Sequence, residues 1–453
     1  MTRLCVVGLG KLGACMAACF AARGYEVIGA DTSPATLAAL RAGQAPVPEP
    51  GLQDLLDRAG ARLRVTADAA AAAAASDLTF VVVPTPSLPD GRFSLAHVRA
   101  AVRAVGAGLE TKRERHVVAI TSTVLPGSIE HAIRPTLEAA AGRRCGDALG
   151  LCYNPEFIAL GTVVRDFLAP AMVLIGEAEA WAGETVAAVY RRVCDGGPAI
   201  VRMGLVSAEL AKIGLNAFVT TKISFANMLA ELCEALPGAD VDAVCRALGC
   251  DPRIGPRALR GGLGYGGPCF PRDSVALAAL ARALGRSAAI PEATDRVNDA
   301  VVARVLARVR AHLPPGGRAA VLGLAYKPGT PIVERAHGLA LARALAAAGV
   351  PVTVHDPMAT AAPPDLGDAI AWAETPARAL AGADVAVLAA ADPALAAAAG
   401  RACAERERPL VVVDCWRQLD GAPLPAAVTH VALGRGAPDA ADADRLRALW
   451  AEA

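Results

Sequence analysis

Near the N-terminus the chain reads Leu4-Cys5-Val6-Val7-Gly8-Leu9-Gly10-Lys11-Leu12-Gly13. Its apolar residues predict a buried strand, and its glycines predict a tight turn into an alanine-rich helix that runs towards Arg23-Gly24. A second predicted strand, Tyr25 to Ala30, ends at Asp31. Strand, glycine turn, helix, strand and acid together predict the first βαβ unit of a doubly wound α/β fold.

The same unit has the features of a dinucleotide-binding site. Glycines let the backbone approach a pyrophosphate closely, and the N-terminus of the following helix favours the phosphate charge. Asp31 is placed to bind the ribose hydroxyls, and Thr32-Ser33-Pro34 rather than an arginine follows it. A 2′-phosphate would be repelled there, so we expect NAD as the cofactor rather than NADP. The expected cofactor contacts in this unit are Gly8, Gly10, Lys11, Leu12, Gly13 and Asp31.

Strands and helices alternate on both sides of one long helical segment. That segment, Ser207 to about Leu236, lacks proline and predicts a single helix. The sequence therefore predicts an α/β protein with two Rossmann-like doubly wound domains joined by a long central helix. We expect domain boundaries that divide the chain into residues 1–200, 201–300 and 301–453. Predicted strands are Leu78 to Val83, Val117 to Thr121 and Met172 to Ile175 in the first part, and Ala319 to Leu322, Val350 to Val354, Val385 to Leu388 and Leu410 to Val413 in the last.

The composition is that of a large soluble enzyme. Of the 453 residues 54% are hydrophobic, but alanine inflates this fraction, as in the tract Ala69 to Ala75, which predicts a plain helix. A net charge of +1 gives no basic field for nucleic acid. The sequence shows no apolar stretch of membrane-spanning length and no signal peptide. We therefore expect a cytoplasmic protein with neither membrane nor nucleic acid as a partner.

A second informative stretch is Gly261-Gly262-Leu263-Gly264-Tyr265-Gly266-Gly267-Pro268-Cys269-Phe270-Pro271-Arg272-Asp273. Its glycines would let the backbone fold tightly around a bound polar molecule and present the Cys269 thiol to it. A thiol adds to an aldehyde, and removal of hydride from the adduct leaves a thioester that water can open. Beside a dinucleotide site, this indicates oxidation to an acid. The alternative is a glycine-rich turn with a buried packing cysteine.

Cysteine and histidine spacing gives no sign of a metal site. The chain has 12 cysteines and 7 histidines, without a CxxC pair or a ligand-like histidine pattern. We expect no metal, and we expect the cysteines other than Cys269 to be reduced and mostly buried.

Three polar patterns lie where a ligand could bind. Glu209, Lys212 and Asn216 fall on one face of the long predicted helix. The alternative is a solvated stripe, with Leu210, Ile213 and Phe218 forming the buried side. Pro84-Thr85-Pro86 and the run 122–127 directly follow two predicted strands, at the sheet edge where ligands bind. Lys327, in the turn 323–329, could hold a phosphate of a different nucleotide, which implies a nucleotide-linked substrate.

Taken in order, these motifs resemble the UDP-glucose/GDP-mannose dehydrogenase family, whose members oxidise the 6-hydroxymethyl group of a nucleotide-activated sugar to a carboxylate with two NAD. The similarity covers nearly the whole chain and includes Asn154-Pro155-Glu156-Phe157 and Arg253-Ile254-Gly255. It implies an NAD-binding domain, a central dimerisation domain with the cysteine loop and a C-terminal nucleotide-sugar-binding domain. It also implies a homodimer, and UDP-glucose as substrate, with a UDP-N-acetyl-hexosamine or GDP-mannose as alternatives.

The resemblance implies a role for individual residues. Cys269 matches the nucleophile of the second oxidation, Lys212 the lysine that stabilises oxyanion-like intermediates, and Asn216 its support. Asp273 matches the acid that orders water and tunes that lysine, Thr123 a ligand of the catalytic water, and Glu156 an acid that assists thioester hydrolysis. Further cofactor contacts implied are Pro84, Thr85, Ser122, Thr123 and Lys327. Substrate contacts implied are Glu156, Phe157, Lys212, Asn216, Arg253, Arg260, Tyr265, Gly266, Lys327 and Arg417, of which Arg253 would reach the substrate of the neighbouring subunit.

The chain also departs from the family pattern. Leu160 stands where a second glutamate is usual, and Arg272 where a lysine is usual. Ile332 and Glu334 interrupt an Asp-x-Arg pattern, and Trp416 shifts an arginine to position 417. Two other classes stay open: a single-step β-hydroxyacid dehydrogenase, which needs no cysteine, and a sugar-nucleotide sensor without turnover. Cys269 together with Lys212, Asn216 and Asp273 argues against the sensor.

Overall fold

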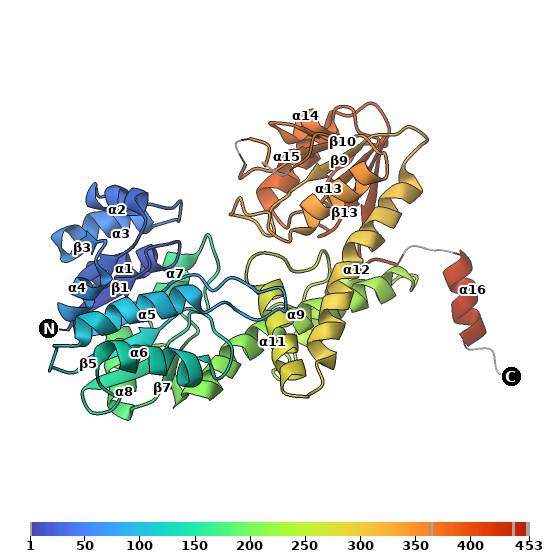
Figure 1. The fold of residues 1–453 in the computed structure, drawn as a ribbon. Coiled ribbons are helices and arrows are strands. Elements are labelled where there is room, and N and C mark those ends of the chain that lie inside the picture. Colours follow the sequence, from blue (N-terminus) through green and yellow to red (C-terminus); the bar gives the residue numbers. More distant parts are fainter. Residues whose placement is uncertain (1, 360, 364–365, 437–439, 450–453) are drawn as a thin grey trace. The chain divides into compact units, whose positions relative to one another are not determined.

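The computed structural model describes residues 2–359, 361–363, 366–436 and 440–449, and Figure 1 traces their elements. The chain forms two compact units, an N-terminal unit, Met1–Leu215, and a C-terminal unit, Asn216–Ala453. The boundary lies inside helix α9 (Leu205–Glu234), which confirms the long helix predicted from Ser207 to about Leu236. The expected division at residues 200 and 300 stays a prediction.

The N-terminal unit is built on an eight-stranded sheet in the order β3-β2-β1-β4-β5-β6-β7-β8. Its first six strands have the order that is typical of dinucleotide-binding folds. The strands are β1 (Arg3–Val7), β2 (Glu26–Ala30), β3 (Leu63–Thr66), β4 (Leu78–Val81), β5 (His116–Ile120), β6 (Leu149–Tyr153), β7 (Met172–Glu177) and β8 (Ala199–Gly204). All neighbours pair in parallel except β6 and β7, so the expectation of a parallel sheet holds apart from that one antiparallel pair.

Helices cover both faces of this sheet. Alternate residues of β1 belong to different hydrophobic clusters, Leu4 and Val6 to one and Cys5 and Val7 to the other, because successive side chains of a strand point to opposite faces. One face carries α1 (Gly13–Ala22), α2 (Pro34–Arg41), α3 (Leu52–Ala59), α7 (Val163–Leu168) and α8 (Ala180–Val193). The other carries α4 (Ala69–Ala74), α5 (Ala96–Leu109) and α6 (Arg134–Ala141).

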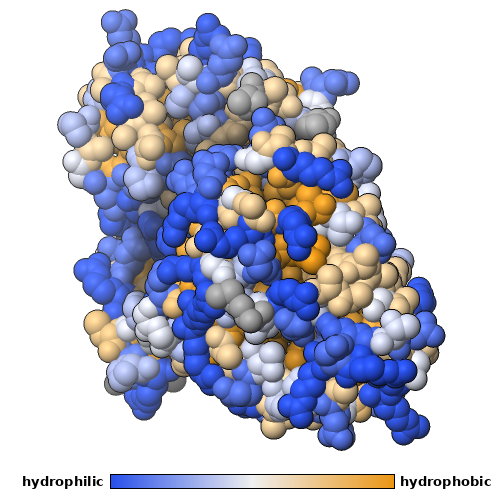
Figure 2. Space-filling view, turned by 90° about the vertical axis from the view of Figure 1, so that its left-hand side faces the viewer, coloured by the Kyte–Doolittle hydropathy of each residue, from blue (hydrophilic) through white to orange (hydrophobic). Residues whose placement is uncertain are grey.

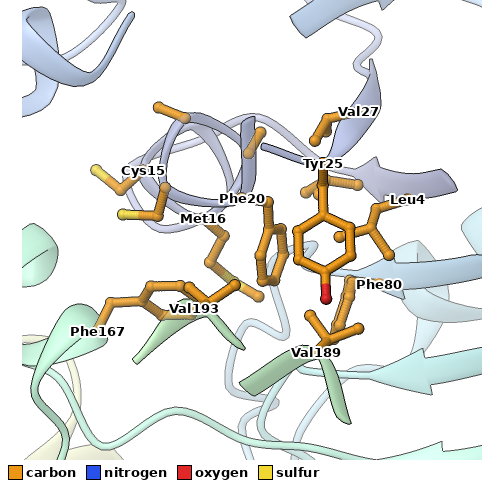
Figure 3. Packing of buried hydrophobic residues seen from close by; sticks show 14 of the residues in the cluster. Leu4, Cys15, Met16, Phe20, Tyr25, Val27, Phe80, Phe167, Val189 and Val193 are labelled. Carbon is orange, nitrogen blue, oxygen red and sulfur yellow. The ribbon is translucent and has the colours of Figure 1, made fainter. Parts of the chain in front are cut away.

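Phe20 on α1 is at the centre of the first cluster (Figure 3). Its ring stacks on Phe80 with centroids 5.0 Å apart, and Phe167 and Tyr190 approach it edge-on at 5.5 and 6.5 Å. Helix α1 is buried from Gly13 to Ala21, which explains its small side chains. This packing fixes the helix whose N-terminus faces the predicted cofactor site.

The C-terminal unit contains a six-stranded sheet in the order β11-β10-β9-β12-β13-β14, with every neighbouring pair parallel. The strands are β9 (Ala319–Leu322), β10 (Val352–His355), β11 (Ile370–Trp372), β12 (Val385–Leu388), β13 (Leu410–Asp414) and β14 (Val428–Ala432). Its helices are α10 (Val241–Gly249), α11 (Phe270–Ala283), α12 (Ala289–His312), α13 (His337–Ala347), α14 (Pro376–Leu380), α15 (Pro393–Ala404) and α16 (Ala440–Leu449). The two sheets confirm the predicted α/β fold with two Rossmann-like domains.

The hydrophobic residues go mainly into these cores. Figure 2 shows a face on which hydrophilic side chains predominate, with hydrophobic side chains interspersed among them. Across the described ranges, no helix combines the length and the apolar character that crossing a membrane requires.

Candidate active site

The first glycine turn lies at the carboxyl end of β1. Gly8 has a φ of +96°, and a Cβ there would lie 2.2 Å from the carbonyl oxygen of Val82. A Cβ on Gly13 would lie 1.8 Å from the carbonyl oxygen of Gly8, so the turn and α1 pack too closely for side chains. Gly10 is exposed and has open space beside it, and no side chain caps α1 at Leu12. This open backbone at a helix N-terminus fits a dinucleotide pyrophosphate.

Asp31 is held next to this turn. Its Oδ2 accepts a hydrogen bond from the backbone N–H of Leu9 at 2.6 Å, and its Oδ1 accepts one from Ser33 at 2.7 Å. A carboxylate oxygen has more than one acceptor site, so both oxygens can still bind hydroxyl groups. The residues present therefore fit an NAD ribose as well as its pyrophosphate.

The loops after β4 and β5 are tied together at the same sheet edge. The Ser122 hydroxyl donates to the carbonyl oxygen of Val83 at 2.7 Å and accepts from its N–H at 2.9 Å. The Thr85 hydroxyl donates to the carbonyl oxygen of Thr123 at 2.8 Å. Pro84 is exposed and Thr123 is half-buried. The structure thus brings these predicted residues together at the carboxyl ends of the strands.

Lys212 on α9 is joined to the predicted Asn-Pro-Glu-Phe motif. Its Nζ donates to the backbone carbonyl of Glu156 at 2.6 Å and lies 4.5 Å from the centroid of the Phe157 ring. The Glu156 carboxyl accepts a hydrogen bond from the Tyr190 hydroxyl at 2.5 Å. Burial raises the pKa of Glu156 to about 7, although Tyr190 and Lys212 oppose the shift. A carboxyl group with that pKa can exchange a proton at neutral pH.

The polar face of α9 is buried, so the solvated-stripe alternative is wrong. Glu209, Lys212 and Asn216 are 0%, 7% and 6% exposed, whereas Leu210 and Phe218 are 48% and 65% exposed. A buried polar residue on a helix needs partners, and this helix face obtains them from neighbouring segments.

Glu209 has a role that its sequence position did not reveal. Its two carboxylate oxygens accept hydrogen bonds from the N–H groups of Gly127 and Ile129 at 2.7 and 2.9 Å. These groups lie at the start of a π-helical turn, Ile129–Ile133, directly after the loop that carries Thr123. Burial raises the pKa of Glu209 to about 7. Glu209 thus attaches this loop to α9.

In the C-terminal unit, Cys269 is exposed and occupies the N-cap position of α11. The glycines before it pack closely against protein atoms, and the expectation that their backbone folds around a bound molecule stays a prediction. A Cβ on Gly262 would lie 2.6 Å from the Trp416 ring, one on Gly264 would lie 2.0 Å from Oδ1 of Asn298, and one on Gly266 would lie 2.4 Å from the backbone oxygen of Arg335. Close packing therefore requires these glycines.

Asp273 is a buried carboxylate one helical turn after Cys269. Its Oδ2 accepts a hydrogen bond from Nδ2 of Asn216 at 2.7 Å, and its Oδ1 accepts one from Nε of Arg272 at 3.0 Å. Only 1% of its side chain is exposed. The predicted pair Asn216 and Asp273 is thus brought into direct contact. Arg272, noted in the sequence as a departure from the family pattern, neutralises the acid.

Several predicted substrate contacts lie elsewhere around the cysteine loop. Arg253 pairs with Asp251 and has 88% of its side chain exposed, and Lys327 is half-buried. Arg260 donates to the backbone oxygen of Trp416 at 2.8 Å. Gly266 and Tyr265 are buried, and the Tyr265 hydroxyl donates to Asp295.

Arg417 has a structural position, which corrects the expectation that it contacts substrate. Its guanidinium binds both carboxylate oxygens of Asp242, at 2.6 and 2.9 Å. It also donates to the backbone oxygens of Gly261 and Leu433 at 2.7 and 2.9 Å. Only 1% of the side chain is exposed, so its donors are used within the fold.

Most cysteines are reduced and buried, as predicted, but Cys250 is exposed in addition to Cys269. None of the 12 forms a disulfide, and Cys5, Cys15, Cys19, Cys152, Cys194, Cys233 and Cys245 are buried as expected, as are Cys403 and Cys415. Cys145 is half-buried. Cys250 is exposed, as Cys269 is. The sequence did not indicate this exposure, because Cys250 follows a segment with a helical apolar pattern.

Known proteins share this arrangement. Models of the NAD binding domain, the central domain and the UDP binding domain of the UDP-glucose/GDP-mannose dehydrogenase family match residues 2–194, 206–300 and 320–421. A UDP-glucose 6-dehydrogenase of Haloferax volcanii is 40% identical over 91% of this chain and 96% of its own. A GDP-mannose 6-dehydrogenase of Pseudomonas putida is 33% identical over 78% of this chain and 80% of its own.

A solved structure gives the same result for the fold. The UDP-glucose dehydrogenase of Pyrobaculum islandicum superposes with a TM-score of 0.86 at 36% identity, covering 96% of this chain and 98% of its own. Sequence and fold therefore agree over almost the entire length. The chain belongs to the UDP-glucose/GDP-mannose dehydrogenase family and is an NAD-dependent dehydrogenase of a nucleotide sugar.

Proposed function

We propose that this enzyme oxidises C6 of UDP-glucose from the alcohol to the carboxylate, with two NAD per sugar. The relatives named for UDP-glucose support this substrate, because the Haloferax protein is more similar over more of the chain than the GDP-mannose relative. The observation that carries the reaction type is Cys269, an exposed thiol that begins α11 one turn before the buried Asp273–Asn216 pair. A single oxidation to an aldehyde would not need that thiol.

Cys269 supplies the covalent chemistry. NAD, when bound, accepts the hydride in each of the two oxidations. Between them the Cys269 sulfur bonds to the aldehyde carbon, and the carbonyl oxygen takes up the thiol proton, which gives a thiohemiacetal. Loss of hydride and a proton from this adduct leaves a thioester. Water then adds, the C–S bond breaks and the carboxylate leaves, so that the thiol is restored.

Lys212 stabilises the negative charge that develops on the C6 oxygen. Its Nζ is buried and fixed by the Glu156 carbonyl, so little reorganisation is needed when the charge forms. Asn216 is four residues along the same helix, and it holds Asp273. In this proposal Asp273 orders water and tunes the charge at the reacting centre.

Glu156 acts as the base in thioester hydrolysis. Its raised pKa of about 7 makes it a better proton acceptor than an ordinary glutamate, while about half remains ionised at neutral pH. Thr123 helps to hold the attacking water. Leu160, where the family usually has a second glutamate, leaves this task to Glu156.

NAD would be held by Gly8, Gly10, Lys11, Leu12, Gly13 and Asp31, and further along the sheet edge by Pro84, Thr85, Ser122 and Thr123. Lys327 in the C-terminal unit would contact a phosphate of the cofactor or substrate. Substrate contacts are proposed for Phe157, Arg260 and the backbone of the cysteine loop at Tyr265 and Gly266.

Replacement of the nucleophile tests the proposal. Cys269→Ser should still bind the nucleotide sugar, but it should stall the second oxidation or trap a slowly hydrolysed ester, with a loss of overall turnover of several kcal/mol, ~3 or more. Cys250→Ser is the matched control, because that cysteine is exposed too but lies outside the loop. NADH produced per sugar and the trapped adduct are measured. Wild-type NADH production by Cys269→Ser would overturn the thioester mechanism.

The choice of substrate is tested separately. Purified enzyme is given UDP-, GDP-, CDP- and dTDP-linked sugars, and NADH formation is followed. We expect UDP-glucose to have the highest kcat/KM and to yield two NADH without free aldehyde. One NADH per sugar with an aldehyde or ketone product would instead support a single-step dehydrogenase.

We further propose that the enzyme is a homodimer joined along α9. Phe218, Phe225 and Leu232 repeat at seven-residue intervals on one helix face and are 65%, 46% and 53% exposed. Such a stripe on a 30-residue helix is typical of a helix-pairing surface. Arg253 lies in a loop attached to α9, because Lys222 donates to the backbone oxygens of Ile254 and Gly255. This exposed arginine could then contact the substrate of the partner subunit.

A further inference from the structure

The turn after β9 lies directly against the cysteine loop. The N–H of Gly267 donates to the backbone oxygen of Glu334 at 2.8 Å. The turn is closed on itself by a hydrogen bond from the N–H of Tyr326 to the backbone oxygen of Ile332 at 3.0 Å. Two segments distant in the sequence are therefore held together beside Cys269.

The aromatic ring of Tyr326 packs on the backbone of Gly267. A Cβ on Gly267 would lie 2.6, 2.7 and 3.0 Å from Cε2, Cδ2 and Cζ of this ring, and Gly267 has a φ of +82°. Cζ, the atom that carries the hydroxyl, is among the nearest atoms. The ring edge that runs from Cδ2 to Cζ therefore lies over the cysteine loop at Gly267, two residues before Cys269.

A negative charge on Cys269 would act on the hydroxyl group of Tyr326. Burial, and then the negative charge that Cys269 would carry, raise the pKa of Tyr326 to about 12. A cation lies nearby in Lys327, whose Nζ is 5.8 Å from the ring centroid. Tyr326 therefore keeps its proton at neutral pH and can donate a hydrogen bond.

We propose that Tyr326 is a positioning residue for Cys269, whose thiolate accepts a hydrogen bond from the tyrosine hydroxyl. The inference rests on the proposed role of Cys269 as nucleophile. A hydrogen bond to a thiolate favours the charged sulfur over the thiol, so a larger fraction of Cys269 is ready to add to the aldehyde. The same bond stabilises the sulfur when it leaves during thioester hydrolysis.

Tyr326→Phe distinguishes this role from packing, because it keeps the ring on Gly267 and removes only the hydroxyl. The experiment measures the rate at which iodoacetamide alkylates Cys269 across a pH series, by peptide mass spectrometry on the full-length protein. Cys250 is the internal reference in every sample, since it too is exposed. The readout needs neither NAD nor a nucleotide sugar.

In Tyr326→Phe we expect the apparent pKa of Cys269 to rise, and alkylation at neutral pH to fall roughly tenfold. The high-pH plateau and the Cys250 profile should not change. An unaltered Cys269 profile would overturn the proposal, and so would an equal shift at Cys250, which would show a general change. If Cys269→Ser proved fully active, the proposed catalytic role would fail, yet the Tyr326 effect on this thiol would still be measured.

Discussion

At the scale of single residues, the site depends on groups whose acidity or contacts differ from their ordinary behaviour. Glu156 is half-protonated near neutral pH because burial disfavours its charge. Asp31 is a fixed carboxylate next to the glycine turn. Each leads to a measurable expectation.

Thioester hydrolysis should accelerate as the pH rises through about 7, because Glu156 accepts a proton only when ionised. Glu156→Gln should slow thioester hydrolysis by roughly a hundredfold or more and remove its dependence on pH. Single-turnover kinetics of product release, followed from mildly acidic to mildly alkaline pH, measure both effects. A profile that is the same in Glu156→Gln and wild type would exclude Glu156 as the base. Glu209→Gln should keep the dependence, since Glu209 faces a loop backbone.

Cofactor preference should follow from Asp31. The wild-type enzyme should prefer NAD over NADP in kcat/KM, on the order of a hundredfold, because a 2′-phosphate would meet a carboxylate. Asp31→Asn removes the charge at equal size and should narrow this preference. Comparable kcat/KM values for the two cofactors in wild type would show that Asp31 does not read the ribose.

At the scale of elements, helix α9 and the cysteine loop are each held in place by buried polar contacts and close backbone approach. Glu209 attaches α9 to the loop that carries Thr123, and the glycines of the cysteine loop fit against neighbouring side chains. Both features can be tested by stability measurements.

The contribution of Glu209 and Glu156 to the stability of the fold should fall as the pH rises from about 4.5 to about 7. Glu209 and Glu156 have folded-state pKa values of about 7 against 4.5 unfolded, so the folded state binds more protons in this window. A tenfold difference in proton affinity between the folded and unfolded states contributes about 1.4 kcal/mol to the free energy of unfolding. Glu209→Gln should flatten the decline, leaving the part due to Glu156. Urea unfolding at several pH values measures how the free energy of unfolding depends on pH. A decline as steep in Glu209→Gln as in the wild type would contradict the raised pKa of Glu209.

Two glycine-to-alanine changes should have opposite effects. Gly264→Ala should destabilise the fold by ~1–3 kcal/mol, because its Cβ would lie 2.0 Å from Oδ1 of Asn298, which accepts the Tyr265 N–H. Gly214→Ala is the matched control: it lies within α9 with open space around it, and it should stabilise by ~0.5–1 kcal/mol. Thermal unfolding compares them. A neutral Gly264→Ala would show that the loop can adjust.

At the scale of the whole molecule, the proposed dimer depends on the exposed apolar face of α9. Phe225→Lys would place a charge in the middle of that face, and analytical ultracentrifugation should show a monomer. Leu284→Lys, at an exposed position outside α9, should leave the dimer intact. A wild-type enzyme that is active as a monomer at every assay concentration would contradict the proposal.

Much of the fold could be predicted because its signals are local. The stretch from Leu4 to Gly13 needs only its own backbone geometry to specify strand, turn and helix, and Asp31 follows at the end of the next strand. Predicted strands agree closely at β9 and β12, where the apolar run is uninterrupted. Strands β3, β6, β8, β11 and β14 were missed. Of these, β3 and β8 are only partly buried and carry an arginine among apolar residues.

Sequence patterns were enough to predict the two doubly wound sheets, the long helix and the candidate residues Cys269, Lys212, Asn216 and Asp273. The contacts between distant residues, in contrast, are visible only in the folded structure. Arg417 is buried on Asp242, Glu209 holds a loop, and Tyr326 lies against Gly267. The physical reason is that periodicity and turn chemistry act over a few residues, whereas these contacts join segments distant in sequence. Such contacts are fixed only when the elements pack.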